Sequence, residues 1–227
     1  FNPDVILYNK QSLILKKKIK INKKFLDISK LSNNKFNKIK KPHKLAYIIF
    51  TSGTTGEPKG VMITRDNLLN YILWAKNFMK ISPKDRWSQY PNIGFDLSVL
   101  DIYGCLCFGA TLYPITDEKD ILFPTRFIKK YKLTIWNSVP STIDIMSTDK
   151  HWKKGILSSL RLLTFCGEPL LQSHLEKIFF VHPKAKIQNT YGPTEATVSC
   201  TATILTKKNF LHKIYKSVSL GSPIKNM

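Results

Sequence analysis

The 227-residue sequence has few acidic side chains and almost no arginine. Asp and Glu together number 15 against 36 for Lys and Arg, and only four of those 36 are arginines. Phosphate and base recognition commonly uses the planar fork of Arg. The formal net charge of +21 is therefore weak grounds for a nucleic-acid-binding function, and we expect no nucleic-acid partner. An acidic protein would still be attracted to such a basic surface.

Patterns for structural metals and disulfides are also lacking. Cys105, Cys107, Cys166 and Cys200 include no C-x-x-C pair, and the five His residues show no H-E-x-x-H spacing. These absences argue against a zinc site and against a disulfide framework.

The sequence contains no run of 18 apolar residues, so we expect no membrane insertion. Residues 1–4 lack an initiator Met and are not followed by the charged and apolar regions of a signal peptide. These features predict a cytoplasmic protein. The hydrophobic content of 43% is enough for a sizeable core.

Composition separates residues 1–44 from the remainder. This stretch holds 13 Lys against only Asp4 and Asp27, and it lacks sustained periodicity after an apolar run at 4–8. We predict the end of a preceding strand unit, followed by a Lys/Asn-rich connector. Residues 45–227 are predicted to form the main domain.

From residue 45 onward, short apolar runs alternate with helical patterns. Strands are predicted at 45–50, 87–90, 110–115, 133–139, 160–166, 186–190 and 197–205, and helices at 66–79, 97–108, 123–131, 141–146 and 170–180. This alternation is typical of an α/β fold with layered, largely parallel sheets and flanking helices. Such sheets bind ligands in the loops at the carboxyl ends of their strands.

The loop after the strand at 45–50 combines hydroxyls, glycines and one lysine. Glycines let backbone N–H groups converge on an anion, hydroxyls donate to phosphate oxygens, and a lysine adds mobile positive charge. The order differs from G-x-x-x-x-G-K-[ST], which disfavours an ordinary P-loop kinase or GTPase. A flexible linker is the plain alternative. The predicted triphosphate-binding residues are Thr51, Ser52, Gly53, Thr54, Thr55, Gly56 and Lys59.

Three ordered motifs carry a resemblance to a known superfamily. They are YIIFTSGTTGEPKGV at 47–61, FDLS at 95–98 and NTYGPTE at 189–195. The sequence resembles the AMP-forming adenylating enzymes, which include acyl-CoA synthetases, luciferases and the adenylation domains of nonribosomal peptide synthetases. The likeness begins near residue 45 and ends near 223, and it implies the central part of the large N-terminal domain. The family's small C-terminal domain is expected to be absent, so we expect a fragment.

Within the superfamily, the FDLS motif and the FCGEPL stretch at 165–170 are most similar to amino-acid activators, especially D-alanine:D-alanyl carrier protein ligases. The resemblance assigns Asp96 to the substrate ammonium group, a sensible pairing because a carboxylate in an apolar pocket prefers a cation. A helix N-cap is the alternative role of Asp96. Cys166 and Val198 match positions that line the amino-acid pocket, where a small thiol favours an alanine-sized substrate. For Cys166 a plain core role stays open.

The resemblance also implies a nucleotide site for ATP and Mg²⁺. Tyr191 would stack on adenine, Asn189 would lie near the purine edge, and Thr194 would contact the α-phosphate. Glu195 would hold Mg²⁺, which prefers hard oxygen ligands. Thr194, Glu195 and Lys59 are the predicted catalytic residues. The other predicted nucleotide-binding residues are Gly167, Glu168, Pro169, Thr190, Gly192 and Pro193.

The resulting hypothesis is ATP-dependent activation of an amino acid to an aminoacyl-adenylate with release of pyrophosphate. The aminoacyl group would then pass to the phosphopantetheine thiol of an acidic carrier protein. Charge stabilisation, rather than a protein nucleophile, would dominate this chemistry. An acyl-CoA or fatty-acyl ligase of the same superfamily is one alternative, and a truncated, non-catalytic basic binding module is the other.

Overall fold

The structure, a computed structural model, describes residues 5–8, 24–27, 44–52, 57–215 and 217–226. The chain divides into two compact units, Phe1–His43 and Lys44–Met227. Within the described residues, no helix is both long and apolar enough to cross a membrane.

The first unit contains a pair of parallel strands, β1 (Val5–Tyr8) and β2 (Lys24–Asp27). β1 confirms the strand predicted at 4–8. β2 corrects the prediction of an irregular connector at this point of the chain. Its apolar run is only two residues long in the sequence, too short to give a periodic signal among the surrounding lysines.

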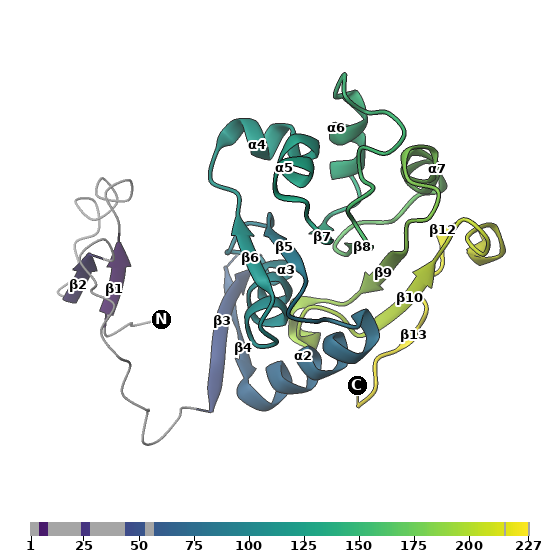
Figure 1. The fold of residues 1–227 in the computed structure, drawn as a ribbon. Helices are drawn as coiled ribbons and strands as arrows, with labels where there is room; N and C mark the ends of the chain where they lie inside the picture. The colour runs from purple at the N-terminus through teal and green to yellow at the C-terminus, as the bar shows by residue number, and fades with distance from the viewer. Residues whose placement is uncertain (1–4, 9–23, 28–43, 53–56, 216, 227) are drawn as a thin grey trace. The chain divides into compact units, whose positions relative to one another are not determined.

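A seven-stranded sheet forms the centre of the second unit, in the order β13-β10-β9-β8-β7-β5-β6 (Figure 1). β6, β5, β7, β8 and β9 run parallel, whereas β10 is antiparallel to both β9 and β13. This arrangement confirms the predicted α/β class with a largely parallel sheet. In the order given, the strands are Ser222–Pro223, Thr201–Leu205, Ile187–Tyr191, Leu162–Phe165, Ile135–Ser138, Arg86–Gln89 and Thr111–Pro114.

Helices alternate with these strands, and two small antiparallel sheets complete the unit. The α-helices are α2 (Arg65–Met79), α3 (Leu97–Val99), α4 (Glu118–Leu122), α5 (Pro124–Tyr131), α6 (Thr142–Thr148) and α7 (Gln172–Val181). The remaining helical turns are η2 (Leu100–Gly104), η3 (Thr194–Ala196) and η4 (Leu211–Lys213). The small sheets pair β3 (Leu45–Thr51) with β4 (Lys59–Thr64), and β11 (Ile214–Tyr215) with β12 (Ser217–Val218).

Two predicted elements differ in the structure. The helix predicted at 97–108 changes from α to π geometry over η2, where Trp87 Nε1 donates to the buried carboxylate of Asp101 (3.1 Å). The strand predicted from 197 begins only at Thr201, because Thr197 and Val198 have φ values of 60° and 72°. Those values lie outside the β region, so this segment turns rather than extends.

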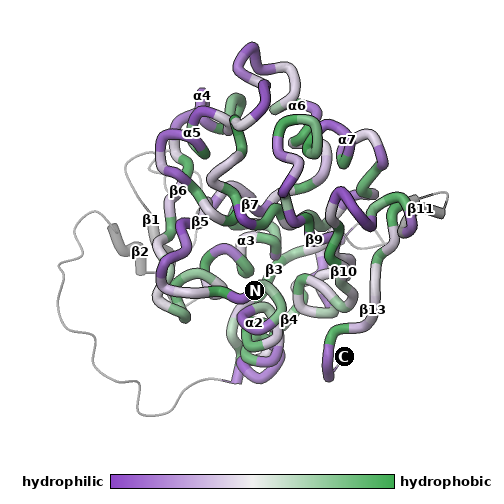
Figure 2. Tube along the Cα trace, turned by 45° about the vertical axis from the view of Figure 1, so that its right-hand side comes forward, coloured by the Kyte–Doolittle hydropathy of each residue, from purple (hydrophilic) through white to green (hydrophobic). Residues whose placement is uncertain are grey.

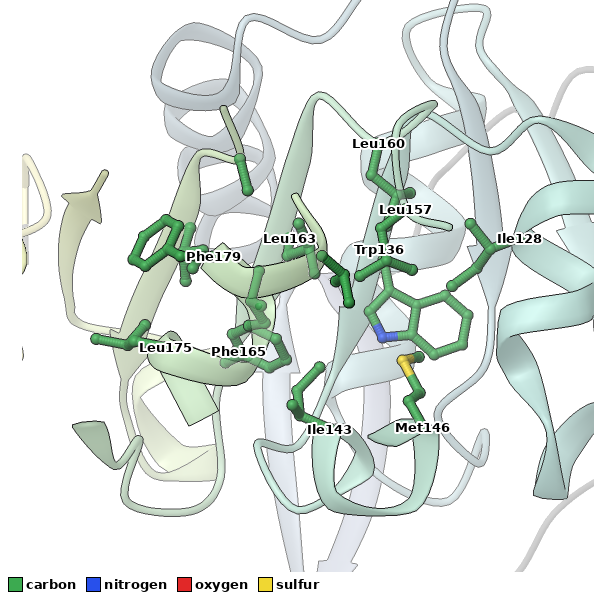
Figure 3. Close-up of a cluster of buried hydrophobic side chains, with 14 of the residues drawn as sticks. Ile128, Trp136, Ile143, Met146, Leu157, Leu160, Leu163, Phe165, Leu175 and Phe179 are labelled. Atoms are coloured by element: carbon green, nitrogen blue, oxygen red, sulfur yellow. The ribbon is translucent and has the colours of Figure 1, made fainter. Parts of the chain in front are cut away.

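Both faces of the sheet are covered by apolar side chains. Ile135 and Leu162 point into the cluster that α2 covers, while their chain neighbours Trp136 and Leu163 point into a second cluster with residues of α5, α6 and α7. This alternation follows from the two-residue period of a strand. Figure 3 shows the second cluster around Trp136, and Figure 2 shows apolar segments along the sheet with hydrophilic segments among the covering helices.

Asp85 links three elements at the edge where the parallel strands begin. Its carboxylate accepts hydrogen bonds from Arg161 Nε and Nη2 (both 2.7 Å) and from Thr134 Oγ1 (2.7 Å). Burial raises the pKa of Asp85, but these bonds and that from the Ser82 amide outweigh it, so the pKa is lowered overall. The ion pair between Asp85 and Arg161 therefore stabilises the fold at pH values above the usual carboxyl pKa. This stabilisation is lost as the pH falls through the lowered pKa of Asp85.

We expect Arg161→Met to reduce the free energy of unfolding by about 2 kcal/mol at neutral pH, because the buried Asp85 carboxylate then lacks hydrogen-bond donors. Partial solvent exposure of the guanidinium keeps the effect from being larger. Urea denaturation at pH 7 and pH 3 would measure this, and the difference from the unaltered protein should shrink at pH 3. Lys207→Met, which removes an exposed cation, should change stability by less than about 0.5 kcal/mol. Equal losses in the two variants would refute the role of Asp85.

Candidate nucleotide and substrate site

A cavity of about 530 Å³ lies where β8 and β9 end. Because parallel strands end at the same edge of a sheet, the loops after β8 and β9 meet there. Seven of the predicted nucleotide-binding residues line this cavity: Gly167, Glu168, Pro169, Thr190, Tyr191, Gly192 and Pro193. Three further residues line it: Leu170, which ends the FCGEPL stretch but is not a predicted nucleotide-binding residue, and Val218 and Leu220, which lie outside every motif.

Two glycines in the cavity wall occupy positions that other residues would not fit, one because of its backbone conformation and one because of a close backbone contact. Gly167 has φ +92°, which L-residues with side chains rarely adopt. A Cβ at Gly192 would lie 2.5 Å from Ser199 Cα and 2.8 Å from Cys200 N. The backbone after Tyr191 thus passes directly against the segment that returns to form β10, and Cys200 N donates to Tyr191 O (2.7 Å).

Hydrogen bonds position the cavity wall. Glu168 Oε2 accepts from the Ser141 amide (3.0 Å), which ties the loop after β8 to the start of α6. Thr190 Oγ1 donates to Phe165 O (3.0 Å) between the ends of β9 and β8. Asn189 is buried and is not among the lining residues; its Nδ2 donates to Ser219 O (3.0 Å), between the lining residues Val218 and Leu220.

Tyr191 offers an exposed aromatic ring at the cavity. Its relative exposure is 51%, although it ends an otherwise buried strand. An exposed ring at the mouth of a cavity can stack on a flat heteroaromatic ligand.

The predicted phosphate-binding segment connects β3 to β4 in the chain. Thr51 and Lys59 are the cross-strand pair next to this connection, and Ser52 and Lys59 are exposed. Gly53, Thr54, Thr55 and Gly56 lie outside the described residues. β4 also lies against η3, so Lys59 belongs to a strand that contacts the turn carrying Thr194 and Glu195.

Glu195 provides an exposed carboxylate on η3. Over the described part of the chain, no cluster of three or more His, Cys, Asp or Glu side chains could hold a metal by itself. Mg²⁺ commonly keeps several waters and binds through one or two carboxylates together with substrate phosphates. A single carboxylate beside a phosphate loop therefore fits magnesium that is held jointly with ATP.

Asp96 is buried and incompletely paired. Its residue exposure is 8%, and Oδ2 has no hydrogen-bond partner among the described residues. Burial raises the pKa of Asp96; the Thr194 hydroxyl and the backbone amides of Asp96 and Leu97 act in the opposite direction, and Glu195 raises it further. Its side chain makes no helix-capping hydrogen bond, so the N-cap alternative has no support in the geometry.

The three predicted substrate residues lie close together. Cys166 Sγ donates to Val198 O (3.7 Å) and lies 3.7 Å from Ser199 Oγ. Burial raises the pKa of the Cys166 thiol, and the charge of Asp96 raises it as well. Val198 is held at φ 72°, an unfavourable conformation for a β-branched residue. Such backbone strain clusters at functional sites.

Two tyrosines near Asp96 were not expected from the sequence. The hydroxyls of Tyr47 and Tyr71 are buried, and neither has a hydrogen bond of good geometry to a described residue. Burial raises the pKa of both, and Asp96 contributes to each increase. They come from β3 and α2, far from Asp96 in sequence. Tyr47 begins the motif at 47–61 but has no predicted role there, and Tyr71 lies outside every motif.

A buried network holds the turn that carries Asp96. Asn137 Nδ2 donates to Leu97 O (3.1 Å) and to Asp101 Oδ1 (2.8 Å), which also accepts from Trp87 Nε1. These bonds connect β5 and β7 to the residue directly after Asp96. The fold therefore fixes the position of this carboxylate through residues that do not themselves line the cavity.

Comparison with known proteins gives consistent matches. Residues 4–227 match the family described as "AMP-binding enzyme". The D-alanine--D-alanyl carrier protein ligase of Bacillus licheniformis is 38% identical over 180 residues, which cover 78% of this chain and 35% of that protein. The L-proline--[L-prolyl-carrier protein] ligase of Pseudomonas fluorescens is 39% identical over 165 residues, covering 71% and 32%.

A solved structure agrees with these matches. The Vibrio cholerae adenylation domain AlmE, in complex with glycyl-adenosine-5'-phosphate, has a TM-score of 0.75 and 31% identity, covering 96% of this chain and 41% of that one. The chain spans about a third of the length of the two curated relatives.

Proposed function

The chain belongs to the AMP-binding enzyme family, and from this membership we propose that it is the central part of an enzyme that activates an amino acid by adenylation. The activated aminoacyl group then passes to the thiol of a carrier protein. The main observation in favour of an amino acid as the substrate is the burial of Asp96. Its Oδ2 has no hydrogen-bond partner among the described residues. A buried carboxylate favours a cationic partner, and the α-ammonium group supplies one.

In this proposal the cavity at the ends of β8 and β9 holds the adenosine part of ATP. The exposed ring of Tyr191 stacks on adenine, and the stretch 167–169 lies along the nucleotide. Asn189 supports this wall by holding Ser219. The cavity volume of about 530 Å³ is within the range usual for small-ligand sites.

The phosphates are bound by the segment that connects β3 to β4 and by η3. Hydroxyls and amides of the loop 51–56 donate to phosphate oxygens, Lys59 adds positive charge, and Thr194 orients the α-phosphate. Glu195 would hold Mg²⁺ together with the phosphates, and the ion would supply positive charge against the charge that develops on the phosphate oxygens. Asp96 anchors the ammonium end of the amino acid, so that its carboxylate can attack the α-phosphorus with pyrophosphate as the leaving group.

Cys166 and Val198 support a small side chain on the substrate. They lie beside Asp96, and Val198 is only 1% exposed while Cys166 is 4% exposed. The curated relatives activate D-alanine and L-proline according to their names, and both are small amino acids. D-Alanine is our first candidate, with an acidic phosphopantetheine-bearing carrier protein as acceptor.

The experiment that tests this proposal is amino-acid-dependent ATP–pyrophosphate exchange on the longest reading frame containing this chain. The panel contains D-alanine, L-alanine, glycine, L-proline, larger L-amino acids and several fatty acids. We expect exchange with one small amino acid. Exchange with fatty acids alone would replace the proposal with an acyl ligase. Absence of exchange, together with no stabilisation by ATP, would favour a non-catalytic module.

A further inference from the structure

Two neighbouring hollows on the second unit are rich in Lys and Arg side chains. The first, of about 660 Å³, lies between α5 and the segment after α6, and the second, of about 490 Å³, adjoins it. Lys129, Lys153 and Ile156 line both hollows, so the two form one continuous surface. Figure 2 shows hydrophilic residues along α5 beside the apolar residues that the helix buries.

Seven Lys and Arg side chains gather at this surface, which we call the basic hollow. α5 and the residue after it contribute Arg126, Lys129, Lys130 and Lys132, and the segment after α6 contributes Lys150, Lys153 and Lys154. All seven are exposed. No acidic residue lines either hollow, and within the described residues none of the seven forms an ion pair.

The nearest carboxylate in sequence does not neutralise this charge. Asp149 is buried, accepts from the amide and the ring of His151, and is hydrogen-bonded to Thr125 Oγ1. Burial raises the pKa of Asp149, but these hydrogen bonds outweigh it and lower the pKa to about 2. The negative charge of Asp149 thus lies beneath the surface and interacts with Thr125 and His151 rather than with the lysines.

Helix dipoles explain the position of only some of the cations in the basic hollow. Lys129 and Lys130 lie in the last turn of α5, where cations are stabilised. Lys153 and Lys154 lie well beyond the end of α6 and have no such reason. Like charges held together without counter-charges repel one another, and a bound multivalent anion would relieve this repulsion.

The lining indicates the kind of anion. Protein interfaces have an apolar or aromatic core, and single-stranded nucleic acids stack on exposed aromatic rings. Ile156 is the one apolar side chain in the lining, and it is buried. Ser158 and Ser159 add hydroxyl donors to the second hollow. Hollows of this size, with cations and hydroxyls but no apolar platform, fit a compact ligand whose charge is concentrated on phosphate oxygens.

We propose that the basic hollow is a binding site for a compact multivalent phosphate anion. The site is separate from the nucleotide cavity. Lys132 precedes β7 and the segment 149–161 precedes β8, so the hollow lies where these strands begin, whereas the nucleotide cavity lies where β8 and β9 end. The anion therefore binds without competing with ATP.

Titration calorimetry with inorganic tripolyphosphate tests the site, using the longest reading frame with its nucleotide site saturated by a non-hydrolysable ATP analogue, which also occupies the positions of the β- and γ-phosphates. We expect Lys129→Ala/Lys153→Ala to weaken binding at least about tenfold, equivalent to roughly 1.4 kcal/mol. The charge-matched control Lys207→Ala/Lys208→Ala, which changes exposed lysines outside both hollows, should weaken binding less than about twofold. Lys129→Arg/Lys153→Arg should retain binding.

Equal weakening in both alanine pairs would overturn the proposal, because binding would then reflect net charge alone. Loss of binding when the nucleotide site is filled would also overturn it, since the anion would belong to the ATP cavity. An oligoglutamate peptide or an RNA oligonucleotide that binds these lysines more tightly than tripolyphosphate would replace the phosphate anion with another partner. All variants change exposed side chains, and circular dichroism before titration verifies that they are folded.

Discussion

Asp96→Asn is expected to reduce kcat/KM for amino-acid-dependent ATP–pyrophosphate exchange at least a hundredfold. The substitution preserves the size of the side chain but removes its charge, so the substrate ammonium group enters a buried site without a counter-charge. Removing one partner of a buried ion pair costs about 3–5 kcal/mol, which corresponds to roughly a hundredfold or more in kcat/KM. Stabilisation of the protein by ATP should be unaffected.

The same substitution should increase the stability of the substrate-free protein at neutral pH. Burial raises the pKa of Asp96, so this group contributes stability that is present below the usual carboxyl pKa and lost as the pH rises through the raised value. Asn cannot ionise and avoids that loss. Thermal unfolding at pH 4 and pH 7.5 should show that the advantage of Asp96→Asn exists mainly at the higher pH.

Asp66→Asn is the matched control, because Asp66 is an exposed carboxylate in the first turn of α2. It should change both exchange activity and stability only slightly. Activity of Asp96→Asn within a few-fold of the unaltered protein would show that no ammonium group binds at Asp96. A large drop in stability would instead indicate that Asp96 has a structural role.

Gly192→Ala is expected to reduce the free energy of unfolding by about 3 kcal/mol and to abolish ATP binding. The added Cβ would lie 2.5 Å from Ser199 Cα, and main-chain atoms cannot rotate away as a flexible side chain can. Overpacking of this kind typically costs 1–3 kcal/mol. Any relaxation would separate the turn after Tyr191 from the start of β10 and so deform the cavity. Urea denaturation and a nucleotide-dependent shift in Tm measure the two effects.

Gly155→Ala separates this steric effect from the general cost of replacing glycine. Gly155 has φ +87°, but a Cβ there would meet nothing within 4 Å. We expect a loss of about 1 kcal/mol from backbone strain alone, with the ATP-dependent shift in Tm intact. Gly192→Ala with the same small loss and normal ATP binding would contradict the close approach seen between the two segments.

Local patterns made much of the fold predictable. The strand β8 lies in a short, largely apolar run, and α2 has a 3.6-residue apolar period with a capping residue, Thr64, directly before it. Because such signals are contained within a few residues, they survive without knowledge of the fold. Elements that lack such signals, such as β2 and α4, cannot be predicted from the sequence. The β-branched residues Thr197 and Val198 favour a strand, and the structure has a turn at 197–200 instead.

The sequence by itself determined the family, the order of the elements and the loops that should meet a nucleotide, because motifs and strand ends are local properties of the chain. Only the tertiary structure decided that Asp96 is buried with an oxygen that has no hydrogen-bond partner among the described residues, that Tyr47 and Tyr71 lie near it, and that Asn189 supports the cavity wall. It also decided that lysines from α5 and from the segment after α6 share one surface. Burial, electrostatic coupling and cavities depend on contacts between residues far apart in the chain, which no local pattern records.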